Sequence, residues 1–229
     1  MSFPSPLSVS HALRARPGGA VDARSDLTPG VYEGGLKVWE CSLDLVALLH
    51  STTGRALLGG LPEPPGGRSV LELGCGHALP GIAAYATLLE CCAVPPRLEL
   101  CDFNAETFPQ AALPNLLQAL PNADLSRVAC FAGDWLGLPA GEHELVVASE
   151  TTYSRESCEA TALLLGRHLR PGGVALVAGK RHYFGVGGGS GLFLEEAGRR
   201  GLVEGRTWVM DDGRSNIREI IEVRKAQQN

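Results

Sequence analysis

The sequence predicts an α/β protein built on a doubly wound, mostly parallel, seven-stranded sheet that ends in an antiparallel hairpin. From residue 69 to residue 178, short apolar segments alternate with helical stretches, which is typical of a parallel sheet covered on both faces. The last two apolar segments are instead joined by a short polar link that contains Asp-Gly, which favours a hairpin. The 229 residues, 45% of them hydrophobic, suit one domain with a substantial core.

Each element follows from a local pattern. Residues 1–27 are rich in Ser, Pro, Arg, Ala and Gly and predict a disordered or weakly ordered arm before a domain over 28–229. Apolar residues at helical spacing predict a helix over 38–50, and Gly and Pro predict a loop over 59–68. Strands are expected at 69–73, 97–101, 127–131, 144–149, 173–178, 202–210 and 217–223, with helices near 80–92, 105–119 and 155–169.

Composition excludes several classes of protein. No segment reaches the ~18–20 uncharged apolar residues of a membrane span. The net charge of −5 argues against a general nucleic-acid binder, which is usually basic. Lysine occurs only at Lys37, Lys180 and Lys225 among 20 basic residues, which we interpret as a bias in nucleotide composition.

The seven cysteines form no Cys-x-x-Cys pair, and their number is odd. This pattern favours reduced, mostly buried thiols over a disulfide framework or a zinc site, so no metal is expected. Reduced thiols are typical of a cytoplasmic or nuclear protein.

The strongest local motif follows the first strand, where Glu72 precedes Gly74 and Gly76. Glycines at such a strand end allow a tight turn and let a ligand approach the backbone. The third glycine of a dinucleotide fingerprint would fall at Leu79, and no Gly-Lys-Ser/Thr occurs, so the loop suits neither a pyrophosphate nor a P-loop nucleotide.

Two later strands also end in carboxylates. Asp102 can accept hydrogen bonds from ribose hydroxyls, and Asp134 can accept from an adenine amino group while Trp135 packs on the base. Taken alone, Trp135 is as well explained as a core aromatic. With the glycine loop, these residues describe an adenosine site without phosphate-binding groups, which S-adenosylmethionine fits.

At this point the sequence resembles the protein-histidine N-methyltransferases of the methyltransferase-like group, which are seven-strand, S-adenosylmethionine-dependent enzymes that methylate a histidine of a large-subunit ribosomal protein. Four stretches carry the resemblance: GVYEGGLKVWECS at 30–42, LELGCG at 71–76, SETTY at 149–153 and HYFGVGGG at 182–189. It extends from about residue 26 to about residue 224 and implies a Rossmann-like class I methyltransferase fold. The chain departs from the superfamily at Ala78, where another glycine is frequent.

The resemblance implies a role for each matching residue. Residues 38–42 should border the cofactor, the glycine loop should line its methionine tail, residues 102–104 should hold the ribose and residues 133–135 should meet the adenine. The cofactor-binding residues expected are therefore Val38, Trp39, Glu40, Cys41, Ser42, Glu72, Gly74, Gly76, Asp102, Phe103, Asn104, Gly133, Asp134, Trp135 and Ser149.

The acceptor chemistry centres on Glu150 and Tyr153. Histidine, with an unperturbed pKa near ~6.5, is mostly neutral at pH 7, whereas lysine, near ~10.4, must first lose a proton. A histidine methyltransferase therefore needs control of orientation and tautomer more than a strong base. We hypothesise that Glu150 or a nearby carbonyl accepts the imidazole N–H, that Tyr153 and Phe184 pack the ring, and that Gly187 lies in a glycine-rich wall against the substrate peptide.

Three alternatives stay open. The first is a protein-lysine methyltransferase of the same fold, against which Glu150 argues because related lysine enzymes often carry Asp-x-x-Tyr there. The second is a small-molecule methyltransferase, for whose usual cap the chain has little spare length. The third is a non-catalytic scaffold that binds S-adenosylmethionine. The expected partner is a large-subunit ribosomal protein, met by a monomer with no direct nucleic-acid or membrane contact.

Overall fold

The computed structural model describes residues 34–211, 213 and 216–225. The predicted arm over 1–27 and residues 30–33 of the first family-like stretch lie outside the described residues. Within the described part, no helix is long and apolar enough to span a lipid bilayer.

The described strands form one seven-stranded sheet in the order β3-β2-β1-β4-β5-β7-β6. Five are parallel, and β7 pairs antiparallel with both β5 and β6, so the predicted closing hairpin is confirmed. The strands are β1 (Ser69–Leu73), β2 (Arg97–Asp102), β3 (Val128–Ala132), β4 (His143–Ser149), β5 (Leu169–Lys180), β6 (Leu202–Met210) and β7 (Arg218–Lys225).

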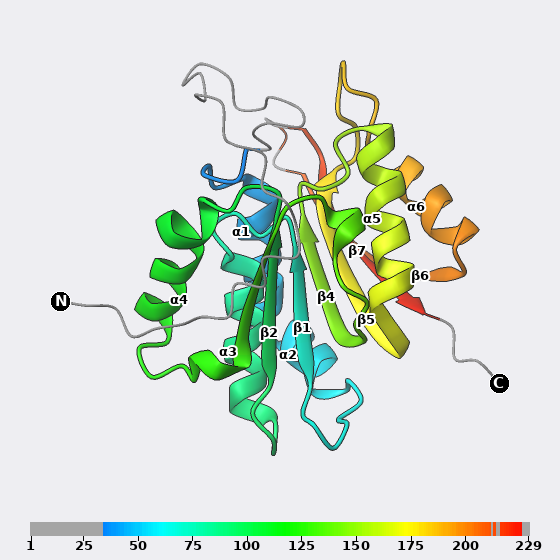
Figure 1. The fold of residues 1–229 in the computed structure, drawn as a ribbon. Helices are drawn as coiled ribbons and strands as arrows, with labels where there is room; N and C mark the ends of the chain where they lie inside the picture. The colour runs from blue at the N-terminus through cyan, green and yellow to red at the C-terminus, as the bar shows by residue number, and fades with distance from the viewer. Residues whose placement is uncertain (1–33, 212, 214–215, 226–229) are drawn as a thin grey trace.

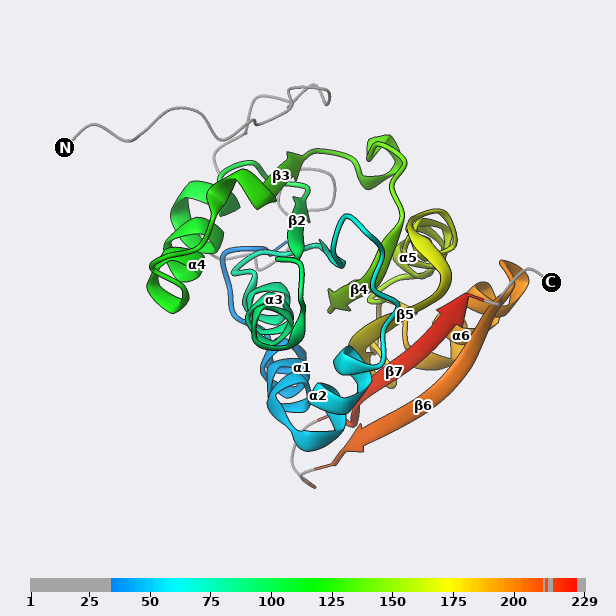
Figure 2. The ribbon, with the colours of Figure 1, turned by 90° about the horizontal axis from the view of Figure 1, so that it is seen from below.

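Helices cover both faces of the sheet, as the fold class predicts (Figure 1). One face packs against α1 (Glu40–His50), α2 (Thr52–Gly59), α3 (Leu79–Cys91) and α4 (Leu113–Ala119), and the other against α5 (Arg155–His168) and α6 (Ser190–Arg199). Figure 2 shows these two groups on opposite sides of the twisted sheet. The central strands are almost wholly buried because both their faces lie in apolar clusters.

The residues in the turns after β4 and β1 fix where α5 and α3 begin. Ser154 and Ser157 form a reciprocal capping box, in which each side-chain oxygen accepts the other residue's backbone N–H, so α5 begins directly after the turn that follows β4. At the start of α3, Pro80 stands where a helix needs no N–H donor, and Ala78 adopts a left-handed conformation with φ +56°. These turns place both helices beside the carboxyl ends of the strands.

The structure differs from the sequence expectation in three helices. The stretch expected as one helix near 105–119 divides into a π-helical turn, Phe108–Ala112, and α4. Pro114 has no backbone N–H to continue the ladder of hydrogen bonds at that junction. The helices α2 and α6 were not predicted, because each is short and carries glycine, Gly54 in one and Gly191 and Gly198 in the other.

Candidate active site

A pocket of about 870 Å³ opens at the carboxyl ends of the parallel strands. Each of the five strands β1 to β5 supplies a lining residue at or just beyond its end: Gly74, Asp102, Asp134, Ser149 and Lys180. Parallel α/β sheets bind ligands at this edge, and the volume lies in the ~300–1,000 Å³ range of small-molecule pockets.

The glycine loop after β1 forms one wall. Gly74 and Gly76 have φ of +62° and +48°, in the left-handed region that favours glycine. A Cβ at Gly76 would lie 2.6 Å from the carbonyl oxygen of Gly35, and one at Gly74 would lie 3.1 Å from the Trp135 ring. Glycine is therefore required at both positions, because the backbone has positive φ there and because Gly35 and the Trp135 ring leave little space for a side chain.

The carboxylate of Asp102 ties this loop to β2. Its Oδ2 accepts the backbone N–H of Gly76 at 2.8 Å, and its Oδ1 accepts that of Asn104 at 2.9 Å. The residue is buried, yet it lines the pocket. A carboxylate offers about four acceptor positions, which suits binding both to backbone N–H groups and to a ligand hydroxyl.

Three buried polar atoms of pocket-lining residues lack a hydrogen-bond partner: Trp135 Nε1, Thr151 Oγ1 and Glu150 Oε1. Buried polar groups in native proteins are nearly always paired, so each such group calls for a partner. They include one N–H donor, one hydroxyl and one carboxylate acceptor, as a polar ligand would require.

Glu150 stands at the end of β4 in a strained conformation. Its φ is +57°, and its backbone N–H donates to the carbonyl of Ala178 on β5 at 2.8 Å. Its Oε2 accepts the hydroxyl of Tyr183 at 2.5 Å, while Lys180 Nζ lies 4.0 Å from Oε1. Burial, followed by the Glu150 charge, holds the pKa of Tyr183 well above its usual range, so Tyr183 is a donor to the carboxylate. Strain of this kind concentrates at functional sites.

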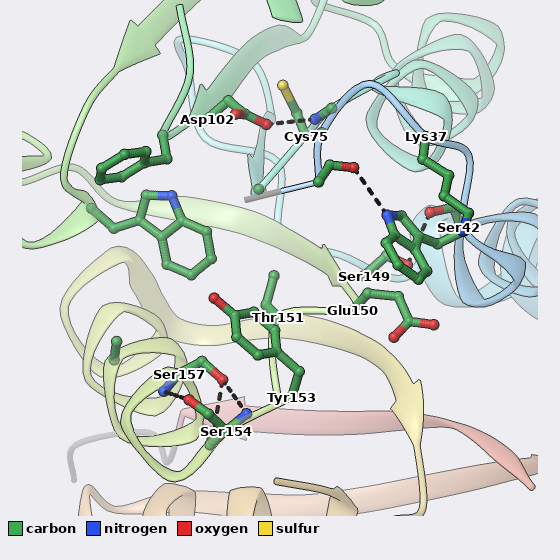
Figure 3. Close-up of a pocket in the computed structure, with 18 of the residues that line it drawn as sticks. Lys37, Ser42, Cys75, Asp102, Ser149, Glu150, Thr151, Tyr153, Ser154 and Ser157 are labelled. Carbon is green, nitrogen blue, oxygen red and sulfur yellow. Dashed lines mark hydrogen bonds between the residues drawn. The ribbon is translucent and has the colours of Figure 1, made fainter. Parts of the chain in front are cut away.

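The start of α1 and the segment before it close the pocket on the side of Glu150. Trp39 Nε1 donates to the carbonyl of Gly34 at 3.1 Å, and the hydroxyl of Ser42 donates to that of Ser149 at 3.0 Å. Figure 3 shows Asp102 at one side of the pocket and Ser149, Glu150 and Lys37 at the other. The pocket therefore has two chemically distinct ends, which we call the Asp102 end and the Glu150 end.

The structure brings most of the residues expected from sequence to this pocket. Those that line it are Val38, Trp39, Ser42, Gly74, Gly76, Asp102, Phe103, Asp134, Trp135, Ser149, Glu150 and Tyr153. Their expected roles stay predictions, because the geometry gives their positions only.

Seven expected residues do not line the pocket: Glu40, Cys41, Glu72, Asn104, Gly133, Phe184 and Gly187. Cys41 is buried in the core, and burial, followed by Glu150, raises the pKa of its thiol. Glu72 is buried behind the loop, where its carboxylate accepts the Gly81 N–H at the start of α3, and burial raises its pKa well above the ordinary value. The side chain of Phe184 is largely exposed outside the pocket.

Sequence reasoning missed Lys37, Thr151, Lys180, Tyr183 and Val186, which all line the pocket. The scarcity of lysine was the available signal for Lys37 and Lys180, and it was assigned to composition. Tyr183 lies beside Phe184 in the same family-like stretch, and only the turn geometry shows that Tyr183 is the ring that faces inward. Among the described residues, no cluster of His, Cys, Asp or Glu could hold a metal ion.

Comparison with known proteins gives sequence relatives of one kind. The chain is 34% identical over 206 residues to "Histidine protein methyltransferase 1 homolog" of Dictyostelium discoideum, covering 87% of this chain and 60% of that protein. It is 32% identical over 221 residues to the rat homologue, covering 83% and 57%, and 33% identical to the Schizosaccharomyces pombe protein, covering 73% and 58%. The chain thus spans less than two thirds of the length of these relatives. No protein-family model matches it.

Solved structures share the fold at low identity. Magnesium protoporphyrin IX methyltransferase from Synechocystis matches with a TM-score of 0.58 and 15% identity over 81% of this chain and 82% of its own. The N-methyltransferase NodS from Bradyrhizobium japonicum matches with a TM-score of 0.57 and 17% identity over 82% and 96%. These likenesses confirm the Rossmann-like fold predicted from sequence.

Proposed function

We propose that this chain, which is similar to histidine protein methyltransferases over most of its length and has a methyltransferase fold, transfers a methyl group from S-adenosylmethionine to a histidine side chain of a protein. The observation that carries the proposal is the Glu150 carboxylate at the pocket end, whose buried Oε1 atom accepts no hydrogen bond. An acceptor in that position suits the N–H of a neutral imidazole.

The pocket residues fit the proposed cofactor. Gly74 and Gly76 line the pocket with a backbone that carries no side chain, and Asp102 beside them suits ribose hydroxyls. The Trp135 N–H, which has no hydrogen-bond partner, marks a polar partner beyond the protein. When bound, S-adenosylmethionine supplies an electrophilic methyl group on a sulfonium, and S-adenosylhomocysteine is left. The chain's own contribution is to bind, orient and exclude water around the two reactants.

Glu150 would control the acceptor tautomer. A neutral imidazole has one N–H and one lone pair on opposite nitrogens, and only the lone-pair nitrogen can attack. If Glu150 Oε1 accepts the N–H, the proton is held on the nitrogen that points at Glu150, and the other nitrogen presents its lone pair. Tyr183 steadies the carboxylate through Oε2, and Tyr153 lines the same cavity, where its ring can pack against the imidazole.

The finer parts of the proposal concern the substrate. We propose a large-subunit ribosomal protein as the substrate, on the resemblance of the four sequence stretches described above. Phe184 and Gly187, outside the pocket, would then contact the substrate peptide, and the protein would act as a monomer in the cytoplasm or nucleus.

Methyl transfer from labelled S-adenosylmethionine to recombinant large-subunit ribosomal proteins tests the proposal, with the product peptide read by mass spectrometry. A methyl group on histidine is expected. Asp102→Asn should weaken S-adenosylhomocysteine binding by about tenfold or more, because the amide provides one acceptor oxygen in place of two. Asp124→Asn makes the same change at an exposed turn and should leave binding intact.

The outcomes separate the competing functions. A methyl group on lysine would replace the histidine activity with that of a lysine methyltransferase. If the protein binds S-adenosylhomocysteine but methylates none of these ribosomal proteins, the proposed substrate is wrong. If the unaltered protein does not bind S-adenosylhomocysteine at all, the proposal that it is a methyltransferase is wrong.

A further inference from the structure

Two of the three lysines of the whole chain lie at the Glu150 end of the pocket. Lys37 and Lys180 both line it, and their Nζ atoms lie 4.7 Å and 5.7 Å from the centre of the Trp39 ring. In a chain where 17 of the 20 lysines and arginines are arginine, a bias in nucleotide composition does not explain why lysine stands at these two positions. A compact ammonium group differs from a broad guanidinium in size and hydration, so the site itself is a reason for lysine.

The surroundings of Lys180 form a cation site. Its Nζ lies 4.0 Å from Glu150 Oε1, 5.7 Å from the Trp39 ring centre and 5.6 Å from the Tyr183 ring centre. Its side chain is 21% exposed. A carboxylate and aromatic faces around an ammonium are the arrangement by which proteins recognise lysine-type cations. Here the ammonium group belongs to the protein itself.

We propose that Lys180 is a specificity-determining residue, whose ammonium group occupies the cation position at the Glu150 end so that the pocket accepts a neutral imidazole and excludes a protonated amine. This inference rests on the proposed function and extends it, because it explains how a fold shared with lysine methyltransferases would select histidine.

Electrostatics supports the exclusion. Without Lys180, the carboxylate and the two rings would attract the ammonium group of a substrate lysine. With Lys180 in place, that attraction is already satisfied, and a second ammonium group nearby would be repelled in a partly buried site where charges interact strongly. A neutral imidazole carries no net charge and can still donate its N–H to Glu150 Oε1, which faces Lys180 at 4.0 Å but accepts no hydrogen bond.

Lys180→Met tests this with little change in shape, because methionine keeps an unbranched, flexible side chain and loses the charge. Lys180→Arg keeps the charge, and Lys37→Met removes an equal charge from the same pocket at the segment before α1. The backbone N–H of Lys180, which donates to the Tyr183 hydroxyl at 3.1 Å, is present in every variant.

The probes are n-butylammonium and 4-methylimidazole, the side-chain analogues of lysine and histidine. They are titrated into nitrogen-labelled protein with S-adenosylhomocysteine present, at about pH 8.5, where the amine is mostly protonated and the imidazole mostly neutral. The tryptophan indole N–H resonances report binding. We expect Lys180→Met to raise the affinity for n-butylammonium relative to 4-methylimidazole by at least about tenfold. Lys180→Arg and Lys37→Met should shift this ratio by less than about threefold.

A peptide pair gives the second readout. The accepted histidine peptide is compared with the same peptide carrying lysine at the acceptor position. In Lys180→Met, lysine methylation should become measurable: the amine nitrogen forms the new N–C bond, the methyl C–S bond breaks with its electron pair left on sulfur, and the amine proton passes to Glu150 or water. An unchanged binding ratio in Lys180→Met, or an equal shift in Lys180→Arg, would overturn the inference. Absence of histidine methylation by the unaltered protein would instead overturn the proposed function, since the binding ratio is measured without turnover.

Discussion

At the scale of single residues, Glu150 concentrates the unusual features of this protein. It combines a left-handed backbone, a short hydrogen bond from Tyr183 and a buried carboxylate oxygen that accepts no hydrogen bond. A residue held in this way costs stability, and its surroundings must impose the conformation. The conformation of Glu150, directly after β4, therefore serves the pocket that it lines.

Glu150→Gln tests the role of this carboxylate. Glutamine keeps the size and one acceptor oxygen but loses the charge and can present its amide N–H in place of an acceptor. We expect kcat to fall about 10- to 100-fold, because control of the imidazole tautomer is weakened, whereas the affinity for S-adenosylhomocysteine should change less than about twofold. Steady-state kinetics and calorimetry measure the two quantities.

Glu195→Gln, at an exposed ion pair on α6, provides the matched control and should leave both quantities unaltered. Equal turnover in Glu150→Gln and the unaltered protein would remove Glu150 from the mechanism.

At the scale of elements, β4 contributes to stability at one end and to the pocket at the other. It lies between β1 and β5, its carboxyl end carries Ser149 and Glu150, and its other end carries Glu144. There the buried Glu144 carboxylate accepts the backbone N–H and the hydroxyl of Ser69 at 2.6 Å and 2.9 Å and pairs with Arg170. One strand thus fixes its neighbours at one end and presents ligand-facing groups at the other.

Glu144→Ala should lower the free energy of unfolding by about 3 kcal/mol, because it leaves the buried Ser69 N–H without its acceptor and Arg170 without its ion-pair partner. The Ser69 hydroxyl keeps the carbonyl of Glu142, at 3.3 Å, as a second acceptor. Urea denaturation measures the loss. Glu144→Gln retains an acceptor oxygen and should lose less. Since the pocket lies at the opposite end of the strand, the affinity of the folded protein for S-adenosylhomocysteine should stay within about twofold. A loss in Glu144→Ala below about 0.5 kcal/mol would show that Ser69 finds another partner.

At the scale of the whole molecule, the two ends of the sheet are specialised differently. The carboxyl ends of the parallel strands carry the pocket, whereas the amino end of β4 and the last turn of α5 bury His143 and His168, with ring centres 6.1 Å apart. The pKa of each is lowered to about 4, chiefly by burial and, for His143, also by the neighbouring His168. Both rings are therefore neutral in the folded protein at pH 7.

This pair predicts sensitivity to acid. Because the folded pKa of each histidine lies below the unfolded value near ~6.5, the unfolded chain binds protons first as pH falls. The contribution of the two neutral histidines to the free energy of unfolding is fully present above about pH 6.5. It is lost as the pH falls toward 4, at up to about 1.4 kcal/mol per pH unit for each histidine.

His168→Leu removes one of the two groups and should make the decline with pH shallower over that interval. Urea midpoints measured between pH 7.5 and 4.5 check this. Parallel curves for the variant and the unaltered protein would contradict the assignment of the acid sensitivity to His168.

Local patterns were enough for most of the fold. All seven strands were predicted, β1 and β6 with their observed bounds, because a buried parallel strand is a short apolar run between turn residues. The glycine loop and the carboxylates at the ends of β2 and β3 were equally visible, since their residue types follow from backbone conformation and donor chemistry at fixed places after a strand. The helices α2 and α6 were not visible, because short glycine-containing helices depend on packing against the sheet.

The sequence by itself therefore determined the fold class, the family resemblance and the pocket residues that lie at strand ends. Only the tertiary structure decided that Glu72 and Cys41 do not line the pocket, and that Tyr183 and Lys180 meet Glu150 there. Those contacts join residues about 30 positions apart and depend on the strained turn at Glu150 and on the side-by-side pairing of β4 with β5. The periodicity of the sequence cannot predict these contacts, because the sheet creates them by bringing the ends of β4 and β5 side by side.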